Sequence, residues 1–577
     1  MPVTSPREWH GLPPKPRPVS SISHCLPALT QRIALLGLGL CLSALSVRAE
    51  PGVFPITDFG AVADGATVNS PAINRAVQAA ARAGGVVVVP AGRFVTGTIY
   101  LRSGVTLRLE AGAELIGSTN LADYPENPLP RPKHWAADEL AQVRYDNLEY
   151  GRHSLIYAAE QSHVAVVGPG RIIGRGDHPN LNKRALRARG VPDREAYLRR
   201  PYGLCFVGCS DVAVRGITLE TMAFWCQDYL DCDGVTVEGV TVRSQQNDAN
   251  NDGIDLDGSR HVRVTGCTLL SGDDSICFKS SYADCDDIEV TNCRLSSFAN
   301  GIKFGTASSG AFRNIRIANI TMQGVGAAGL ALEVVDGGTL DGVRISGITM
   351  EHVGAAIFVR LGDRASRWIE RHGGDRPRIG QLRNVTISDV TASLKNEDDR
   401  PLSGSITGLP GHPVENITLE NIRTVSLHHV DPAEARRASD RPVGEHAGEY
   451  PEYSMFGSLP SYGLYVRHAR GITLRDCAMS FAREDPRAAL VCEDVENLTV
   501  ERLAAAVVAG GGPIIRLRDV NGARVAASVA PTGTGVYLGL EGSTRGVVVQ
   551  GCNLSQADSP VSAGAGRAGT DVILFEP

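Results

Sequence analysis

One short pattern of apolar residues recurs along most of this chain and constrains its fold more strongly than any other feature. Each copy reads apolar-x-apolar-x-x-apolar-x-apolar, and the first six copies follow one another at intervals of 23 to 28 residues. Apolar residues at alternate positions indicate a strand with one buried face, and a repeat of this length indicates a solenoid of stacked coils. We therefore predict an all-β fold, a right-handed parallel β-helix. Leucine-rich repeats are the main alternative, but their Leu-x-x-Leu-x-Leu signature is absent. The eleven copies begin at Val212, Val235, Val262, Ile288, Ile315, Val343, Val385, Ile417, Ile472, Leu498 and Val547.

Three consecutive rows of the repeat carry the most unusual outward residues. They read NNDGIDLDG at 250–258, GDDSICFKSS at 272–281 and ANGIKFGTAS at 299–308. Aligned on their alternation, they predict buried columns formed by Ile254, Ile276 and Ile302 and by Leu256, Phe278 and Phe304; Leu330 and Val343 are also expected inside.

The outward columns follow from the same alignment. Asp252 falls over Asp274, with Asp273 beside it, while Asp257 falls over Lys279 and Asp255 shares a column with Lys303. Neighbouring strands lie about 4.8 Å apart, so stacked like charges destabilise a sheet. Three acids on a solvent face, without an obvious cation among them, therefore indicate a functional site.

Composition favours one long repetitive body over several globular domains. The chain has 64 glycines, only 5% aromatic residues and a formal net charge of −6, which suits short strands joined by tight turns. No basic block with interleaved aromatics indicates a nucleic-acid partner. Thirteen cysteines are present, and four of them stand at an inward position of the repeat, where we expect small core residues rather than disulfides: Cys267, Cys293, Cys477 and Cys552.

The first 49 residues resemble a secretory signal with an upstream extension. Arg32 precedes an apolar run from Ile33 to Val47, and Ala49 offers a cleavage site. This run is too short for a membrane span. We therefore expect residues 50–577 to form the β-helix domain of a secreted or periplasmic protein that is not membrane-bound after cleavage.

A helix is predicted at 71–83, capped by Ser70 and ended by Gly84-Gly85, with an apolar face suited to cover the open first coil. Its apolar face comprises Ile73, Ala76, Val77 and Ala80. Wider intervals between repeats predict insertions that shape a binding face, at 120–158, 176–202, 362–382, 393–414 and 426–462. The second insertion is rich in Lys and Arg, which indicates either a holder for an acidic ligand or a solvated helix.

Several motifs together resemble glycoside hydrolase family 28, the polygalacturonase-like hydrolases. FPITDFGAVADG at 54–65 is similar to the family's opening, MAFWCQDYLDC at 222–232 to the coil ahead of its site, Asn250-Asn251-Asp252 to its Asn-Thr-Asp motif, and Gly272-Asp273-Asp274 to its Asp-Asp motif. The resemblance implies that Asp273 is the general acid and that Asp252 and Asp274 position the attacking water. It also implies a pectic or other plant cell-wall glycan as the substrate.

Elementary chemistry supports this division of roles. Inverting hydrolysis needs a protonated carboxyl at the leaving oxygen and an ionised carboxylate roughly 6.5–9.5 Å away, with water between them. Crowded acids raise the pKa of at least one member. Calcium binding or turn capping is the alternative, above all for Asp255 and Asp257. The sequence requires no metal and no cofactor.

Two departures from the family bear on the substrate. Asn300 stands where the family has the histidine of Gly-His-Gly, and Ala331-Leu332-Glu333 stands where polygalacturonases have Arg-Ile-Lys, whose cations hold a galacturonate carboxylate. We therefore expect weak activity on unbranched polygalacturonate and better activity on a pectic chain of mixed backbone. The residues expected to contact the sugar are Asn250, Asn300, Lys279, Lys303 and Glu333.

Two other functions stay open at this point. A polysaccharide lyase on the same fold would use Lys279 or Lys303 as its base. A secreted carbohydrate-binding solenoid would keep the acids without catalysis. In each case we expect a monomer.

Overall fold

The computed structural model describes residues 52–128, 153–245, 250–281, 283–372, 377–395, 399–563 and 572–575. The predicted signal segment and most of the insertion at 120–158 lie outside these residues. None of the helices in the described part combines the length and apolar character that a membrane-spanning helix needs.

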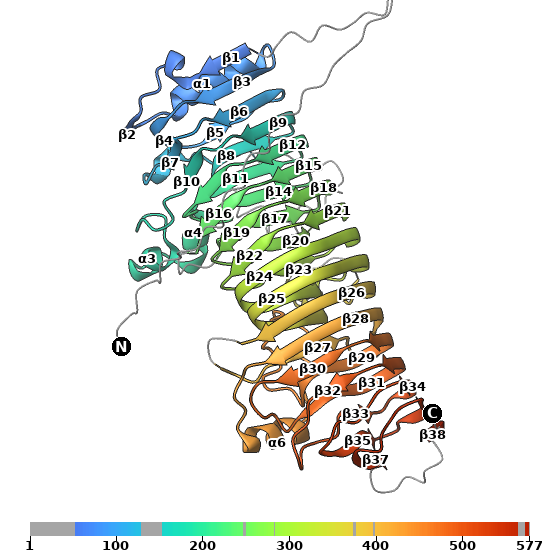
Figure 1. Cartoon of the computed structure of the whole chain (residues 1–577). Helices are drawn as coiled ribbons and strands as arrows, with labels where there is room; N and C mark the ends of the chain where they lie inside the picture. Colours follow the sequence, from blue (N-terminus) through green and yellow to red (C-terminus); the bar gives the residue numbers. More distant parts are fainter. Residues whose placement is uncertain are drawn as a thin grey trace, which may run out of the picture. The chain divides into compact units, whose positions relative to one another are not determined.

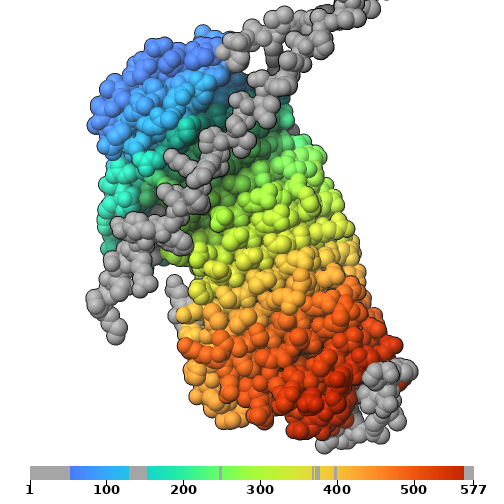
Figure 2. Space-filling view, in the orientation of Figure 1, coloured from blue at the N-terminus to red at the C-terminus, as the bar shows by residue number. Residues whose placement is uncertain are grey.

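The described strands stack as the coils of a right-handed parallel β-helix, which confirms the predicted fold (Figure 1). In Figure 2 the sequence colours follow one another as successive bands along the stack. Each strand pairs in parallel with the equivalent strand of the next coil, so the coil has three faces, each a parallel sheet. The face that carries the acids is called the site sheet. It contains β5 (Ile99–Tyr100), β8 (Ser154–Ala159), β11 (Tyr202–Val207), β14 (Gln227–Leu230), β17 (Ile254–Asp257), β20 (Ile276–Ser280), β23 (Ile302–Ser308), the ends of β24 (Ala311–Val334) and β25 (Thr339–Leu361), β27 (Gly404–Thr407), the starts of β29 (Ser461–Arg475) and β31 (Ala488–Glu501), β33 (Ile515–Arg518), β35 (Thr534–Glu541) and β37 (Ala557–Ala563).

The other two sheets complete each coil. One contains β1 (Gly52–Pro55), β3 (Gly85–Val89), β6 (Val105–Leu109), β9 (Ser162–Val167), β12 (Ser210–Arg215), β15 (Asp233–Glu238), β18 (Arg260–Thr265), β21 (Cys285–Thr291), the starts of β24, β25, β26 (Gln381–Leu394) and β28 (Val414–Ser426), the ends of β29 and β31, β34 (Asn521–Ala526), β36 (Arg545–Gln550) and β38 (Val572–Phe575). The other contains β2 (Asp64–Val68), β4 (Gly92–Thr96), β7 (Ala113–Gly117), β10 (Arg171–Ile173), β13 (Thr218–Glu220), β16 (Thr241–Ser244), β19 (Thr268–Ser271), β22 (Arg294–Ser297), later parts of β24, β25, β26 and β28, β30 (Ala478–Phe481) and β32 (Ala504–Ala505).

The predicted inward columns are confirmed. Ile254 pairs with Ile276, Ile276 with Ile302, and Ile302 with Leu330, and all four side chains are fully buried. Val343 is buried as well. In the next column Phe278 stacks on Phe304 with ring centroids 4.5 Å apart. The cysteines of the repeat are free thiols, as expected, although Cys552 near the end of the chain is only partly buried.

The helix α1 (Ser70–Ala81) packs its apolar face against β1 and β3 at the start of the stack. Its four predicted apolar residues are buried. The cap differs from the prediction, because Asn69 and not Ser70 precedes the helix. The Asn69 side chain accepts a hydrogen bond from the Val62 amide and donates one to the Thr67 carbonyl, so it fastens the preceding loop instead of the helix end.

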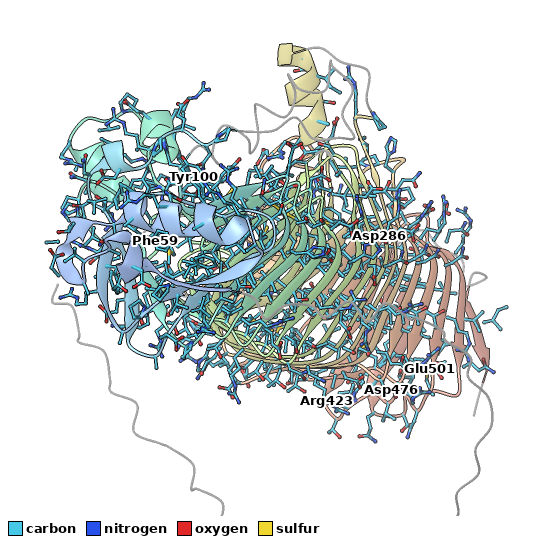
Figure 3. All side chains as sticks on the ribbon, turned by 90° about the horizontal axis from the view of Figure 1, so that it is seen from above. Phe59, Tyr100, Asp286, Arg423, Asp476 and Glu501 are labelled. Atoms are coloured by element: carbon cyan, nitrogen blue, oxygen red, sulfur yellow. The ribbon has the colours of Figure 1, made fainter. Side chains whose placement is uncertain are left out.

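Insertions add the remaining helices around the stack. Residues 176–202 form α3 (Lys183–Ala188) and α4 (Asp193–Leu198), α5 spans Arg364–His372, and α6 spans Pro432–Asp440. Short 3-10 helices occupy Ile56–Phe59 and Leu121–Asp123. Elsewhere the outer face carries charged ladders. In Figure 3 Asp476 and Glu501 lie together at one edge, where Arg502 pairs with both.

Candidate active site

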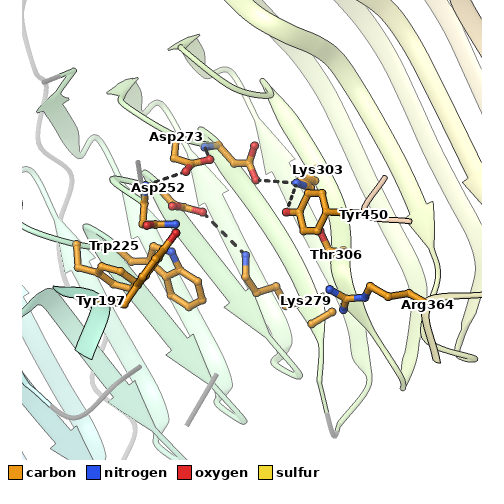
Figure 4. A pocket seen from close by; sticks show the side chains of 14 residues that line it. Tyr197, Trp225, Asp252, Asp273, Lys279, Lys303, Thr306, Arg364 and Tyr450 are labelled. Carbon is orange, nitrogen blue, oxygen red and sulfur yellow. Dashed lines mark hydrogen bonds and ion pairs between the residues drawn. The ribbon is translucent and has the colours of Figure 1, made fainter. Parts of the chain in front are cut away.

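A pocket of about 350 Å³ opens on the outward face of the site sheet (Figure 4). Six of the eight residues predicted for the site line it: Asn250, Asp252, Asp273, Asp274, Lys279 and Lys303. The remaining lining residues are Tyr197, Phe224, Trp225, Gly305, Thr306, Ala307, Arg364 and Tyr450.

The three predicted catalytic acids converge in this pocket. Asp252 precedes β17, and Asp273 and Asp274 precede β20, so the stacking of two coils brings them together. One carboxylate oxygen from each lies within 4.8 Å of the other two. Asp252 and Asp274 are only 4% exposed. The acids therefore lie together on one outward face within a cleft, as predicted, but they are buried more deeply than on an open solvent face.

The expectation of acids without a cation is wrong. The Lys303 ammonium lies 3.4 Å from an Asp274 oxygen. The Lys279 ammonium lies 2.7 Å from Asp255 and 4.0 Å from Asp252. These lysines stand on β20 and β23, so each contacts an acid of the coil before its own. The two cations offset part of the predicted repulsion, which still raises the pKa of Asp252 and of Asp273.

Adjacent acids at the start of β20 have opposite electrostatic surroundings. Burial raises the pKa of Asp273, and the negative charge of Asp274 raises it further. Burial alone would also raise the pKa of Asp274, but the charges of Lys303 and Lys279 and two hydrogen bonds from Asn300 outweigh it and lower that pKa. Asp273 therefore tends to keep its proton under conditions where Asp274 has lost its own.

Asp273 is oriented by two backbone amides. Its carboxylate accepts hydrogen bonds from the amide of Asn250 at 2.8 Å and from the amide of Asp274 at 3.0 Å. The Asn250 side chain accepts a hydrogen bond from the fully buried Arg200 at 3.0 Å. Arg200 belongs to the basic insertion, so this insertion supports the turn that holds the acid.

Asp252 lies beside a second, deeper acid. Burial, followed by the charges of Asp255 and Asp273, raises the pKa of Asp252 well above its usual range. Its Oδ1 atom is buried and has no hydrogen-bond partner among the described residues. Burial raises the pKa of Asp255 to about 7, although Lys279 opposes this effect. Asp257 instead accepts hydrogen bonds from the amide and hydroxyl of Ser281, which is a turn-capping role.

Two residues predicted to contact the sugar do not line the pocket. Asn300 is 2% exposed; its amide nitrogen donates to Asp274 at 2.8 Å, and its oxygen accepts from the Ala328 amide. Glu333 is 1% exposed and packs against Gly305 of the preceding coil. Gly305 lines the pocket, whereas Glu333 does not. Both side chains are covered because the next coils and their insertions close over this part of the sheet.

Sequence reasoning missed the pocket's aromatic and distal residues. Tyr197 comes from α4 in the basic insertion, Arg364 from α5, and Tyr450 from the insertion at 426–462. The Trp225 ring lies 4.5 Å from the Lys279 ammonium. Trp225 stands within a quoted family motif, which was an available signal, whereas the three insertion residues follow no repeat.

The residue that the helices of the basic insertion contribute to the pocket is aromatic, Tyr197. Several of the insertion's cations are engaged in contacts of their own. The Lys183 ammonium lies 3.6 Å from the centroid of the Tyr197 ring, Arg187 pairs with Asp193, and Arg199 pairs with Glu195. The insertion therefore reaches the pocket, as expected, and does so through Tyr197.

Enzymes that hydrolyse glycosidic bonds use a carboxyl group of raised pKa together with an ionised carboxylate. The model of the family "Glycosyl hydrolases family 28" matches residues 85–432, more than half of the chain. The chain therefore belongs to glycosyl hydrolase family 28.

Known relatives agree with this assignment. The chain is 27% identical over 293 residues to a "Probable polygalacturonase" of Vitis vinifera, covering 48% of this chain and 56% of that one. It is 29% identical over 272 residues to an "Exo-poly-alpha-D-galacturonosidase" of Dickeya chrysanthemi, covering 40% and 43%. The match thus spans about half the length of these relatives. An exopolygalacturonase structure from Thermotoga maritima shares the fold with a TM-score of 0.52 and 22% identity, covering 66% of this chain and 89% of that one.

Proposed function

We propose that this protein hydrolyses glycosidic bonds of pectic chains, with Asp273 as the general acid and Asp274 as the base that activates water. The opposite pKa shifts of these neighbours within one pocket carry the proposal. Asp252, which belongs to the adjacent coil, holds the same water. Release of reducing ends from pectic glycans, abolished in Asp273→Asn, tests it.

We propose inversion at the anomeric carbon. The closest oxygens of the three acids lie within 4.8 Å, less than the roughly 6.5–9.5 Å usual between the carboxyl groups of an inverting pair. Inversion is supported instead by the two acids, Asp252 and Asp274, that are available to hold one water. NMR of the first-formed anomer decides this, because a retaining enzyme would release the opposite anomer.

The pocket favours an acidic sugar. The expected discrimination against polygalacturonate depended on Glu333 facing the substrate, and Glu333 does not line the pocket. Lys279 and Arg364 do line it. Arg364 is held by Asp336 through Nε at 2.8 Å and through Nη2 at 2.5 Å. We therefore propose that a uronate carboxylate binds near these cations, in place of the family's missing Arg and Lys.

A comparison of free-acid and methyl-esterified galacturonate oligosaccharides tests this substrate choice. The wild type should prefer the free acid, and Arg364→Gln should reduce that preference about tenfold or more, since paired charges in partly dry sites are worth several kcal/mol. Arg316→Gln, which removes an exposed arginine paired with Glu289, is the matched control. Faster cleavage of a rhamnose-containing backbone than of polygalacturonate would restore the original expectation.

Both ends of the pocket along the stack are covered, which supports action at chain ends. On the coils before the acids, the outward face of the site sheet carries a buried aromatic cluster that includes Tyr202, Phe224 and Trp225. On the coils after them, Val443, Phe456 and Leu459 of the last insertion pack on Ala331 and Phe358. A polymer lying along the stack could not pass both covers. We propose exo action, which viscometry tests: viscosity should fall slowly as reducing ends accumulate.

The lyase alternative has less support. A lyase base must be unprotonated, whereas the pKa of Lys279 and that of Lys303 are raised well above the usual value, because nearby acids outweigh the effect of burial. Unsaturated products absorbing in the ultraviolet would favour it. A non-catalytic binder would release no reducing ends from any glycan.

We also propose that the protein is secreted or periplasmic, because a polymeric pectic substrate lies outside the cell. We further propose that it acts as a monomer. Cell fractionation and the mass of the purified protein in solution test these two points.

A further inference from the structure

The family's histidine beside the acids is absent, and the structure shows what stands in its place. Asn300 occupies that position and supplies two hydrogen bonds to Asp274, one from its backbone amide at 3.0 Å and one from its side chain at 2.8 Å. An amide carries no charge, so it cannot supply the positive potential of an imidazolium. Among the described residues, the cation that lies closest to Asp274 is Lys303, the second residue of β23.

Lys303 is fixed from two sides. Its ammonium lies 3.4 Å from Asp274 Oδ2, and the two side chains are 4% and 5% exposed. It also donates a hydrogen bond to the Tyr450 hydroxyl at 3.3 Å and lies 5.2 Å from the centre of that ring. Tyr450 is 147 residues away in the chain, so the last insertion holds this lysine against the acid (Figure 4).

The wider surroundings of Asp274 make this cation necessary. The acidic groups that act on Asp274 from neighbouring coils and from the last insertion are Asp252, Asp255, Asp273, Glu333 and Glu452, together with the phenol of Tyr450. Lys303 and Lys279 are the cations that oppose them, and Lys279 is engaged at 2.7 Å with Asp255. A buried carboxylate among so many acids takes up a proton unless a cation is close.

We propose that Lys303 is a positioning residue that keeps Asp274 ionised, and so replaces the charge of the missing histidine. This inference rests on the proposed role of Asp274 as base. It gives Lys303 a part in catalysis that does not require contact with the sugar.

The test is the pH profile of kcat/KM in two variants. Lys303→Met removes the charge and keeps most of the volume, so the pKa of Asp274 should rise and the acidic limb of the profile should move up by about 1–3 pH units, the usual effect of one close opposite charge. Lys303→Arg keeps the charge and should keep the limb within a few tenths of a unit. Arg316→Gln is the control for loss of a distant exposed cation, and thermal unfolding verifies that each variant is folded.

Three results would overturn the inference: an unchanged acidic limb with activity reduced equally at all pH values, an increase in KM alone, and a limb that shifts equally in Lys303→Arg. A substrate-free arm separates this inference from the proposed function. The infrared carboxyl band that Asp274→Asn removes should be ionised at about pH 4.5 in the wild type and protonated in Lys303→Met. If the wild type cleaves no pectic glycan but the band behaves in this way, the proposed function fails, while the effect of Lys303 on the ionisation of Asp274 is confirmed. An unshifted band refutes the inference.

Discussion

At the scale of single residues, two adjacent aspartates of this site differ in their hydrogen-bond donors and in the charges beside them. Asp273 accepts hydrogen bonds from backbone amides alone, whereas Asp274 accepts them from the backbone and side-chain amides of Asn300 and also lies beside an ammonium group. The backbone turn before β20 places both in one pocket, and the next coil supplies the groups that separate their pKa values. The acid and base roles that we propose for these residues therefore depend on the coil-to-coil register more than on the two residues themselves.

Replacing the proposed acid tests the first of these roles. Asp273→Asn should lower kcat by several orders of magnitude, because an amide has no proton to give to the leaving oxygen. The melting temperature should fall only modestly, because the single amide oxygen keeps one of the two backbone hydrogen bonds, which Asp273 accepts through different oxygens. Steady-state kinetics and thermal unfolding measure the two effects, and an active, folded Asp273→Asn protein would refute the assignment.

Glu333 gives a prediction about stability. Burial raises the pKa of Glu333 to about 8, well above the value near 4.3 expected in the unfolded chain. The unfolded state then releases this proton first as pH rises, so Glu333 lowers stability progressively between about pH 4.3 and 8. Glu333→Gln should match the wild type near pH 4 and melt about a few degrees higher at pH 8. Equal melting temperatures at pH 8, with equal values at pH 4, would show that this carboxyl is ionised at no cost.

At the scale of elements, the last insertion, at 426–462, forms part of the pocket wall. Glu445 ties it to the β-helix: its side chain pairs with Arg467 and with His468 at 3.2 Å, and its carbonyl accepts from Arg360 at 2.5 Å. The apolar residues around Phe456 cover the site sheet beyond. The insertion thereby presents Tyr450 to Lys303.

Loosening this attachment should weaken the pocket. Glu445→Ala removes the partner of Arg467 and His468, so amide hydrogen exchange across 443–459 should increase and KM should rise severalfold. Glu415→Ala, which removes an exposed partner of Arg470, is the control. Unchanged exchange across 443–459 would mean that apolar packing alone holds the insertion.

The sequence predicted the repeat coils of the β-helix well and the contacts of the insertions poorly. The alternation through Ile254, Ile276 and Ile302 predicted the core and excluded one-residue slips of the register, because such a slip would turn the apolar side chains outward. The motif acids followed from that register. Tyr450 and Arg364 could not be found in this way, because insertions have no period and their contacts span dozens of residues. Glu333 was misplaced for the same reason, since the cover over its coil is a long-range contact.

At the scale of the whole molecule, stability comes from the continuous inner columns. Each coil buries its residues only against its neighbours, so a large aromatic in the middle supports the coils on both sides. The site lies over the stacked rings of Phe278 and Phe304. The rigid stack keeps the spacing of the acids fixed.

A truncation in that column should be costly. Phe278→Ala should destabilise the protein by about 3–5 kcal/mol, the usual cost of deleting a fully buried phenylalanine. Denaturant unfolding measures the change, and Val425→Ala, at a position 38% exposed, should change stability by less than about 0.5 kcal/mol. A Phe278→Ala protein as stable as the wild type would show that the column is not tightly packed.

We propose that this family 28 protein uses these acids on chain ends that enter a pocket covered at both ends along the stack. A chromatographic time course with a defined galacturonate oligosaccharide tests this most directly. We expect a saturated monosaccharide and a substrate shortened by one unit at the earliest times, and neither product with Asp273→Asn. Early products from the middle of the chain, or unsaturated products, would contradict it.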